Sequence, residues 1–538
     1  MCIRDRYSMK QPMTSILKMF TLALLLVSGT ACTDNFDKIN SKDYQVTKQE
    51  QERENYNLGT TLRGLQGLVI PTQEHSYQFI EALAAGPFAG YFGAINPWTT
   101  KFETYNPSVD WIEATFSTVI TNTYPYYRDL QDQSDDPVAL ALGKLLRVAV
   151  MHRVTDMFGP IPYSKVVDKL GGISLSVPYD SQEEVYKQML KELNEVTDVL
   201  KENLDLDPET FRKFDDVYYG NMSKWYKYAN SLKLRFALRM AYVDPITAQQ
   251  VAEAAVQAGV ITSNDDNALL TVEENRASMI FNDWNDHRVG ADIICYMNGY
   301  NDPRREKMFT TVKVKETVGG KPTDVDGYAG VRIGIDVPNK DNVKDRYSKP
   351  ITSTTSPYMW INAAEITFLR AEGALRGWGM GGEAKALYEQ AINLSFEQYG
   401  VSGADTYIAD ATSQPQAYTD PTDSYSAGQT SSITIAWQDG NSNDEANLER
   451  IITQKWIAMF PCTVEAWSEY RRTGYPKLLP VVVNNSGGVI DDSKEKIRRL
   501  WYPPTEYSEN KANILEAINM LGGADNGATR LWWDKKPR

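Results

Sequence analysis

Two successive helical segments, residues 357–378 and 382–399, restrict the possible folds of this chain more than any other feature. The first segment (PYMWINAAEITFLRAEGALRGW) stops at Gly377, and the second (GEAKALYEQAINLSFEQYG) starts after a turn rich in glycine. Small side chains on both segments would let the two helices approach closely, at Ala371, Ala374, Ala384 and Ala391. We therefore expect an antiparallel helix pair.

Helical periodicity also dominates the rest of the chain. Ser181 and Glu184 form a capping-box pattern that opens a helix with an apolar stripe to Leu200. Other helices are expected at residues 137–158, 223–242, 246–259, 445–460 and 507–521. The helix pairs are typical of tetratricopeptide-like hairpins, although no strict 34-residue period runs through the chain. We expect a mostly α fold of such pairs.

Two segments depart from this helical pattern. Residues 311–352 alternate in places between apolar and polar side chains and predict a few short strands. Residues 401–443 are rich in Ser, Thr, Asp, Gln and Tyr and predict a long loop insertion. Structureless segments of this length within a domain usually have a function. We therefore expect residues 401–443 to form a functional surface loop.

The N-terminus is typical of an exported lipoprotein. Lys10 and Lys18 precede an apolar run of nine residues, Met19 to Val27, and small residues then lead to Cys32. The apolar run is shorter than the roughly 20 residues that span a bilayer. Residues 1–31 are therefore predicted to be a signal peptide, Cys32 the lipidated residue, and residues 32–55 the polar tether. Residues 1–8 fit poorly as a signal start, which leaves Met1, Met9 and Met13 as alternative starts.

Residues 56–538 are expected to form a single domain, because no linker rich in Pro, Gly and Ser divides them. Residues 1–31 carry a net charge of +3 in a chain of net charge −14, so the remaining chain carries −17. Such acidity argues against nucleic-acid binding, which needs clustered Lys and Arg. Cys295 in an apolar run is typical of a buried thiol, and a disulfide to Cys462 is the alternative.

No catalytic motif is present, so no catalytic residue is assigned and a binding protein rather than an enzyme is expected. His152 lies in an apolar helix and is interpreted as a core residue. Glu365 and Glu372 share a helix, where pairing with neighbouring arginines is favoured over a glycosidase pair. Residues 439–445 begin like a calcium loop but lack its sixth-position glycine. No metal or cofactor is therefore expected, with structural calcium as the alternative.

Aromatic residues in polar surroundings provide the candidate ligand site. Flat aromatic faces bordered by Asn, Asp and Gln suit sugar rings, which stack on the aromatic face while their hydroxyls form hydrogen bonds. The alternative is that these rings fasten loops to the core. The candidate ligand-binding residues are Trp98, Tyr105, Trp111, Trp284, Asp286 and Trp437.

Several strings occur in a fixed order along nearly the whole chain. They are Asp156–Ser164 (DMFGPIPYS), Pro178–Tyr186, Trp225 with residues 229–239, Asp302–Arg304, Ala371–Gly373 with Gly377–Trp378, Gln454–Trp456, Glu465–Trp467, Arg471–Pro476, Tyr502–Pro504 and Leu531–Asp534 (LWWD). With these strings the chain resembles the SusD/RagB family of nutrient-binding outer-membrane lipoproteins of Bacteroidetes, especially its SusD-like branch.

The resemblance implies a mostly α fold in which tetratricopeptide-like helix pairs form an α-α superhelix beside an irregular, loop-rich ligand-binding region. It also implies a lipid-anchored protein at the cell surface, on the outer membrane. It implies capture of glycan or oligosaccharide nutrients and their delivery to a SusC-like TonB-dependent transporter, over which the lipoprotein closes like a lid. Among the family's functional residues, only the acylated cysteine carries over, onto Cys32. A peptide-binding member of the family, a surface glycoside hydrolase and a structural assembly protein are the alternative functions.

Overall fold

The computed structural model describes residues 56–166, 176–206 and 209–537. The predicted signal peptide, lipidated Cys32 and tether lie outside these residues. The helices in the first half of the chain are α4 (Tyr56–Val69), α5 (Glu74–Tyr77), the π-helical η1 (Gln78–Ala85), α6 (Gly86–Phe88), α7 (Val109–Thr115), α8 (Ser117–Gln133), α9 (Pro137–Phe158), α10 (Gln182–Lys201), α11 (Glu209–Phe214), α12 (Met222–Met240) and α13 (Pro245–Ala258).

The second half is also mainly helical. Its helices are η2 (Asn264–Asp266), α14 (Ser278–Asn282), α15 (Ala291–Gly299), α16 (Arg305–Met308), η3 (Lys340–Asn342), α17 (Ala363–Leu375), α18 (Ala384–Tyr399), α19 (Ala404–Ile408), η4 (Asn441–Asn443), α20 (Asp444–Ala458), α21 (Thr463–Thr473), α22 (Pro504–Glu509) and α23 (Lys511–Leu521). No described helix is both long enough and apolar enough to cross a bilayer.

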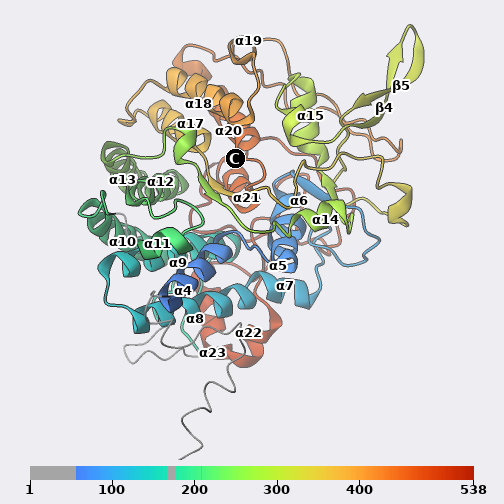
Figure 1. The fold of residues 1–538 in the computed structure, drawn as a ribbon. Helices are drawn as coiled ribbons and strands as arrows, with labels where there is room; N and C mark the ends of the chain where they lie inside the picture. The colour runs from blue at the N-terminus through green and yellow to red at the C-terminus, as the bar shows by residue number, and fades with distance from the viewer. Residues whose placement is uncertain (1–55, 167–175, 207–208, 538) are drawn as a thin grey trace, which may run out of the picture. The chain divides into compact units, whose positions relative to one another are not determined.

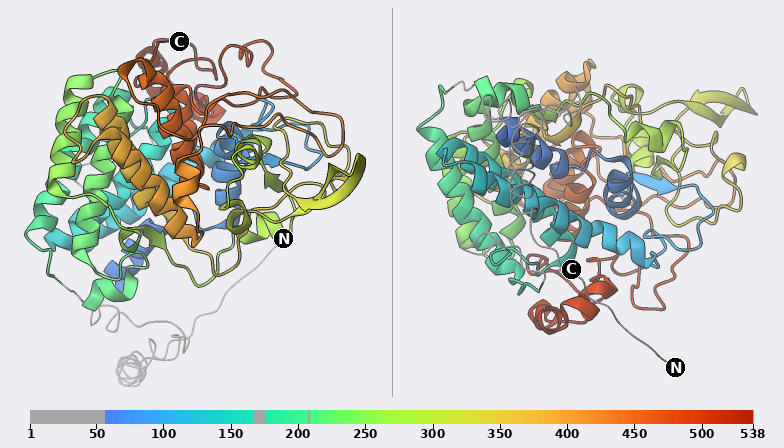
Figure 2. Two further views of the ribbon diagram at one scale, coloured as in Figure 1. Left: turned by 90° about the horizontal axis from the view of Figure 1, so that it is seen from above. Right: turned by 60° about the horizontal axis from the view of Figure 1, so that its bottom comes forward.

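Successive helices pack as pairs, which confirms the expected mostly α fold. Helix α9 packs on α8 and α10, α12 packs on α10, α13 and α17, and α17 packs on α18 and α20. Figure 1 shows these helices on one side of the unit, with α14, α15 and the β4–β5 hairpin on the other. Figure 2 shows from above that the helices lie side by side. Residues Leu58–Arg538 form one compact unit.

Local signals explain where several helices begin and end. The Ser181 hydroxyl accepts a hydrogen bond from the backbone N–H of Glu184, and the Glu184 carboxylate accepts one from the backbone N–H of Ser181. This is the predicted capping box. Helix α18 ends at Gly400, whose φ of 62° favours glycine because it lacks a Cβ atom. The Asn510 backbone interrupts the single helix expected over residues 507–521 and leaves two helices, α22 and α23.

The prediction of a helix from residue 357 is wrong for its first turn. Residues Tyr358–Ile361 form strand β6, and the helix α17 starts only after Asn362, whose side chain accepts a hydrogen bond from the N–H of Glu365. All four strand residues are buried, and they pair with the antiparallel strand β2 (Ala268–Leu270). Burial on both faces removes the alternating pattern by which a strand is recognised.

Two further strand pairs form the irregular side of the unit. Strands β4 (Val312–Val318) and β5 (Lys321–Gly327) make a hairpin whose turn residues Gly319 and Gly320 both have positive φ. They confirm the strands expected within residues 311–352. Strand β1 (Phe92–Ala94) pairs antiparallel with β3 (His287–Val289). This pairing brings two segments together that lie almost 200 residues apart in the chain.

The predicted loop insertion at residues 401–443 is mostly irregular, as expected, but it contains α19 and η4. Cys295 and Cys462 are both buried and both free, so the alternative of a disulfide between them does not hold. Cys295 packs with Ala291, Tyr418 and Leu479, which confirms its prediction as a buried thiol.

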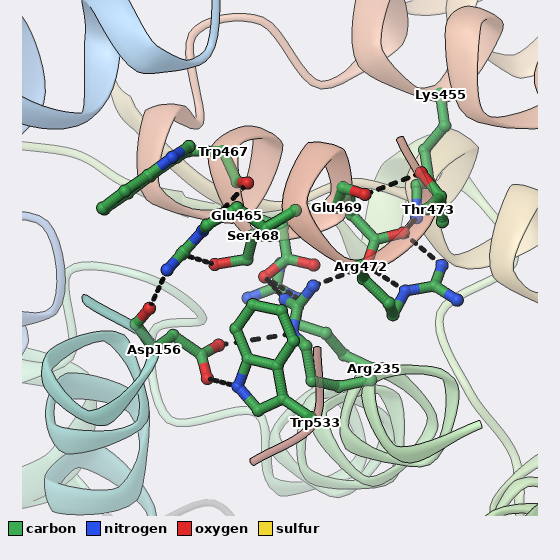
Figure 3. A network of polar contacts seen from close by, with 12 residues as sticks. Asp156, Arg235, Lys455, Glu465, Trp467, Ser468, Glu469, Arg472, Thr473 and Trp533 are labelled. Carbon is green, nitrogen blue, oxygen red and sulfur yellow. Dashed lines mark hydrogen bonds and ion pairs between the residues drawn. The ribbon is translucent and has the colours of Figure 1, made fainter. Parts of the chain in front are cut away.

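A network of buried charges joins helix α21 to the helix pairs. Arg239 of α12 donates hydrogen bonds to Glu465 and Glu469 of α21, both at 2.5 Å. Arg472 donates to Glu469 and, with both terminal nitrogens at 2.6 Å, to Glu372 of α17. Figure 3 shows Glu465, Glu469 and Arg472 on neighbouring turns of α21, with Asp156 facing them across the network. Each buried charge in this network therefore has a counter-charge, as buried ions require.

Candidate functional site

Three tryptophans predicted as ligand-binding residues lie close to the β1–β3 strand pair. Trp98 follows β1, Trp111 lies in the first turns of α7, and Trp284 lies between α14 and β3. All three side chains are half-buried, whereas Trp225, Trp456, Trp467 and Trp533 are completely buried in the core. We call Trp98, Trp111, Trp284 and Asp286 the aromatic cluster.

The β1–β3 ladder continues into the cluster and sets the positions of its members. The N–H of Ile95 donates a hydrogen bond of 2.9 Å to the carbonyl of Asp286. Trp98 therefore leaves the ladder beside the segment that carries Trp284. The ring of Trp98 meets the ring of Trp111 edge-on, with centroids 5.3 Å apart and an angle of 85° between the planes. This T-shaped arrangement is one of the two that aromatic pairs prefer.

Two further aromatic rings hold Trp111 from the core side. Phe102 stacks on Trp111 with centroids 6.0 Å apart, and Phe79 of η1 lies at the same centroid distance. The ring of Trp98 also lies 6.2 Å from that of His287. These contacts fix the orientation of both indoles, so that a ligand need not order them.

Asp286 is the polar centre of the cluster and is only 8% exposed. Its Oδ1 accepts hydrogen bonds from Asn96 Nδ2 at 2.5 Å and from Lys340 Nζ at 3.1 Å. Its Oδ2 accepts one from Gln78 Nε2 at 2.9 Å. Lys340 also donates to the carbonyl of Trp284 at 2.8 Å. The carboxylate thus ties η1, the segment after β1 and η3 to the segment of Trp284.

Trp284 lies beside exposed residues at one edge of the cluster. Its ring lies 5.1 Å from that of His75, whose side chain is 58% exposed. Asn282 and Asp283, which precede Trp284, are exposed. The edge of the cluster at Trp284 therefore combines aromatic surface with polar groups that are open to solvent.

His287 lies under the cluster and is completely buried. Burial lowers its pKa from 6.5 to about 4, the carboxylate of Asp286 opposes this shift, and Arg288 and Lys340 add to it. The imidazole is therefore neutral at pH 7. One ring nitrogen of His287 lies 3.3 Å from Gln78 Nε2. The same nitrogen of Gln78 donates a hydrogen bond to Asp286, so Gln78 contacts both residues.

The structure does not bring the other two candidates to the cluster. Tyr105 is buried against Phe88, and its hydroxyl donates a hydrogen bond to Asp492. Its ring therefore fastens a loop to the core. Trp437 is half-buried, but its ring packs against Tyr388 of α18, 5.5 Å away. Figure 1 shows α18 well separated from α7, the helix of Trp111.

Several residues of the site were missed by the sequence analysis. His75, Gln78, Phe79 and Lys340 belong to segments that carry no motif, and they reach the cluster only through tertiary contacts. Asn96 could have been found, because it lies two residues before Trp98 in a polar aromatic segment. A sequence pattern cannot reveal the others.

The carboxyl pair considered for glycosidase chemistry lies in the scaffold. Glu365 is completely buried and binds Arg235 at 2.8 Å, and Glu372 is completely buried between Arg376 and Arg472. Pairing of Glu372 with Arg376 is confirmed, whereas Glu365 pairs with Arg235 and not with Arg370. His152 is a core residue, as predicted, and bonds the carbonyl of Val148.

The possible calcium loop forms the short helix η4 and the start of α20. Within the described ranges, no group of three or more His, Cys, Asp or Glu side chains is arranged to hold a metal ion.

Comparisons with known proteins agree with this architecture. The family model SusD-like, described as Susd and RagB outer membrane lipoprotein, matches residues 38–534. A SusD homologue from Bacteroides thetaiotaomicron is 52% identical, covers 89% of this chain and 99% of its own, and has a TM-score of 0.84. A homologue from Bacteroides ovatus is 42% identical with the same coverages and a TM-score of 0.83. No curated protein matches the chain.

One of the similar structures is a chitin-binding SusD homologue from Flavobacterium johnsoniae. It is 38% identical, covers 89% of this chain and 98% of its own, and has a TM-score of 0.79. The family model covers most of the sequence, and the relatives share the helix pairs over almost their whole length. The chain therefore belongs to the SusD-like family of SusD and RagB outer membrane lipoproteins.

Proposed function

We propose that the protein captures an oligosaccharide at the cell surface and delivers it to a SusC-like TonB-dependent transporter. The observation that carries the proposal is the aromatic cluster, which combines three half-buried indoles near the β1–β3 strand pair with a carboxylate held by Asn96, Gln78 and Lys340. Aromatic faces bordered by a few convergent polar groups are typical of small-molecule sites. The sugar ring would stack on an indole, and its hydroxyls would bond the polar edge near Trp284.

The proposed activity is binding without catalysis. SusD-like proteins are binding proteins, and this chain belongs to their family. The carboxyl pair that a glycosidase would need is not available in α17, because Glu365 and Glu372 are buried and ion-paired. A surface glycoside hydrolase is therefore the weaker proposal, and release of product from a polysaccharide by the purified protein would support it.

The chitin-binding relative suggests the first ligand to test. Chitin oligosaccharides offer apolar sugar faces together with amide groups, and they suit a site that combines indoles with hydrogen-bonding side chains. A peptide is the alternative ligand, because aromatic and polar groups also accept peptide side chains. We further propose that a lipid on Cys32 anchors the protein in the outer membrane and that residues 33–55 are its tether.

Calorimetric titration with chitin, starch and xylan oligosaccharides and with mixed peptides tests the ligand class. Trp98→Ala and Trp284→Ala are expected to weaken oligosaccharide binding by about tenfold each, which corresponds to about 1.4 kcal/mol. Trp437→Ala is the matched control, because Trp437 is also half-buried but packs on Tyr388 away from the cluster. The thermal unfolding temperature of each variant shows whether weaker binding results from lost ligand contacts or from loss of the folded structure.

Two outcomes would overturn the proposed site. The first is oligosaccharide affinity that survives both cluster substitutions in folded protein, and the second is affinity lost only in Trp437→Ala. Binding of peptides without oligosaccharides would keep the site and replace the ligand class. Co-purification with a co-expressed transporter tests the partner, and loss of fatty-acid labelling in Cys32→Ala tests the anchor.

A further inference from the structure

A cavity of about 150 Å³ is lined by none of the residues of the aromatic cluster and has no assigned role. Its wall combines segments from most of the chain, including Tyr77 of α5, Phe92 of β1, Phe281 of α14 and Tyr358 of β6. The rings of Tyr77 and Tyr358 lie 5.9 Å apart and form one aromatic wall. Most of the residues that line the space are aromatic or aliphatic, so the cavity is mainly apolar.

One polar group at the cavity lacks a partner. Asn275 lines the cavity and is only 4% exposed. Its Nδ2 donates a hydrogen bond of 2.7 Å to the carbonyl of Ser356, but none of the described residues donates to its Oδ1. A buried acceptor without a donor costs about 1–3 kcal/mol, so the structure carries a penalty that a bound donor would remove.

Three other polar groups of the wall already have partners. Glu81 binds Arg153 and also accepts a hydrogen bond from the Thr463 hydroxyl at 2.5 Å. The Tyr358 hydroxyl accepts a hydrogen bond from the N–H of Ala277 at 3.3 Å. The carbonyl of Ser356 is occupied by Asn275. Asn275 Oδ1 is therefore the buried acceptor that still lacks a donor among the described residues of the wall, and a ligand with many hydroxyl groups would find few partners.

Size and polarity together define the ligand class. A cavity of about 150 Å³ lined by apolar side chains accommodates a single benzene-sized ring. A sugar ring carries several hydroxyls, and most of them would be buried without partners here. We propose that this cavity binds a single aromatic ring that carries one hydrogen-bond donor, namely a phenol, whose hydroxyl donates to Asn275 Oδ1.

The entrance is compatible with such a ligand. Ile351 lines the cavity and is 52% exposed, and Lys307 lines it with a side chain that is 49% exposed. The exposed Ile351 therefore places apolar surface where the lining of the cavity meets solvent. Phenols reach this site either as free small molecules or as the tyrosine side chain of a peptide, and both sources share the ring and the hydroxyl.

The test is a calorimetric titration of the full soluble chain with 4-methylphenol, toluene, glucose and N-acetyl-tyrosinamide. Saturable binding of 4-methylphenol, about fivefold tighter than that of toluene, is expected because one hydrogen bond is gained. Glucose should not bind the cavity. Binding of N-acetyl-tyrosinamide would identify a peptide side chain as a source, whereas binding of 4-methylphenol alone would identify free phenols.

Two variants locate the binding. Ala277→Met places a flexible side chain into the cavity from a residue that lines it, and it should abolish binding of both 4-methylphenol and toluene. Asn275→Leu should remove the preference for 4-methylphenol over toluene, but both ligands should still bind through their aromatic ring. Trp98→Ala is the control and should leave 4-methylphenol binding unchanged, because Trp98 does not line the cavity.

The proposal fails if the wild-type protein binds 4-methylphenol no better than toluene, or if neither ligand binds. It also fails if folded Ala277→Met keeps full affinity. A crystal soaked in 4-bromophenol gives a check that depends on no variant, since the bromine atom must appear within the cavity. None of these results depends on oligosaccharide binding, so this proposal and the proposed function can fail separately.

Discussion

Replacing Arg472 by methionine tests whether the buried charge network holds the helix pairs together. The Arg472 side chain is completely buried and binds both oxygens of Glu372 at 2.6 Å and both oxygens of Glu469 at 2.8 and 2.6 Å. Methionine fills similar space but leaves two carboxylates with fewer counter-charges. Glu372 would keep only Arg376, which binds it at 2.8 Å.

Two lines of reasoning give a similar magnitude. Removal of one partner from a buried ion pair typically costs about 3–5 kcal/mol. Burial alone would raise the pKa of Glu372, but Arg472 and Arg376 outweigh burial and lower it from 4.5 to about 2. At 1.36 kcal/mol per pKa unit, this shift corresponds to about 3 kcal/mol of folding free energy at neutral pH.

The pH dependence has a definite sign. A carboxyl group whose pKa is lower in the folded protein stabilises the fold fully above its unfolded pKa, and this stabilisation is lost as the pH falls toward the folded pKa. The contribution of Glu372 is therefore complete above pH 4.5 and disappears between pH 4.5 and 2. The difference between wild type and Arg472→Met should be largest at pH 7 and should shrink in acid.

Urea unfolding at pH 7 and pH 3.5, followed by circular dichroism, measures both quantities. The matched control is Arg63→Met, because Arg63 binds Asp216 at 2.7 Å but its side chain is 46% exposed. Such a surface pair contributes about 1 kcal/mol or less. The reasoning is refuted if Arg472→Met costs no more than Arg63→Met, or if its cost is the same at both pH values.

Three smaller predictions concern the site and the thiols. The contribution of His287 to the unfolding free energy should fall by about 3 kcal/mol as the pH falls from 6.5 to 4, because burial lowers its pKa to about 4 and protonation then favours the unfolded chain. Urea unfolding should show this contribution as the difference in pH dependence between wild type and His287→Phe. Tyr105→Phe should lower the free energy of unfolding, measured in urea, by about 1–2 kcal/mol because the hydrogen bond to Asp492 is lost. The variant should keep the oligosaccharide affinity of wild type in calorimetry. A loss of affinity would show that Tyr105 belongs to the site. Burial raises the pKa of both Cys295 and Cys462. A chain starting at Thr33 should therefore not react with thiol reagents when it is folded, and it should react with two equivalents when it is unfolded. No reaction after unfolding would indicate a disulfide.

The sequence predicts those parts of the fold that depend on neighbouring residues. The helix that starts after Ser181 is specified by its own capping box and apolar stripe, and the structure has it at Gln182–Lys201. Strand β6 was missed because it depends on β2, which lies about 90 residues earlier. A fully buried run such as Tyr358–Ile361 has the same composition in a strand as in a helix, so only its partner decides between them.

The same limit applies to the candidate site. By composition, Trp98, Tyr105 and Trp437 are equivalent, since each lies in a polar segment. The structure distinguishes them through contacts that no local pattern encodes. Trp98 meets Trp111, Tyr105 bonds Asp492 almost 400 residues later, and Trp437 packs on α18. A sequence can therefore nominate aromatic residues for a site, but only tertiary contacts select among them.

The aromatic cluster and the cavity share a wall, and this decides which variants can separate their roles. The ring of His287 lies 6.2 Å from Trp98 in the cluster and 6.3 Å from Phe281, which lines the cavity. A substitution at His287 would disturb both sites, so a loss of binding there would not show which site had failed. Trp98 and Ala277 each belong to one site only. Trp98→Ala and Ala277→Met, each titrated with oligosaccharide and with 4-methylphenol, therefore give four independent affinities. Two independent sites require that each variant loses one ligand and keeps the other. A variant that loses both while remaining folded would show instead that the β1–β3 wall couples the two sites.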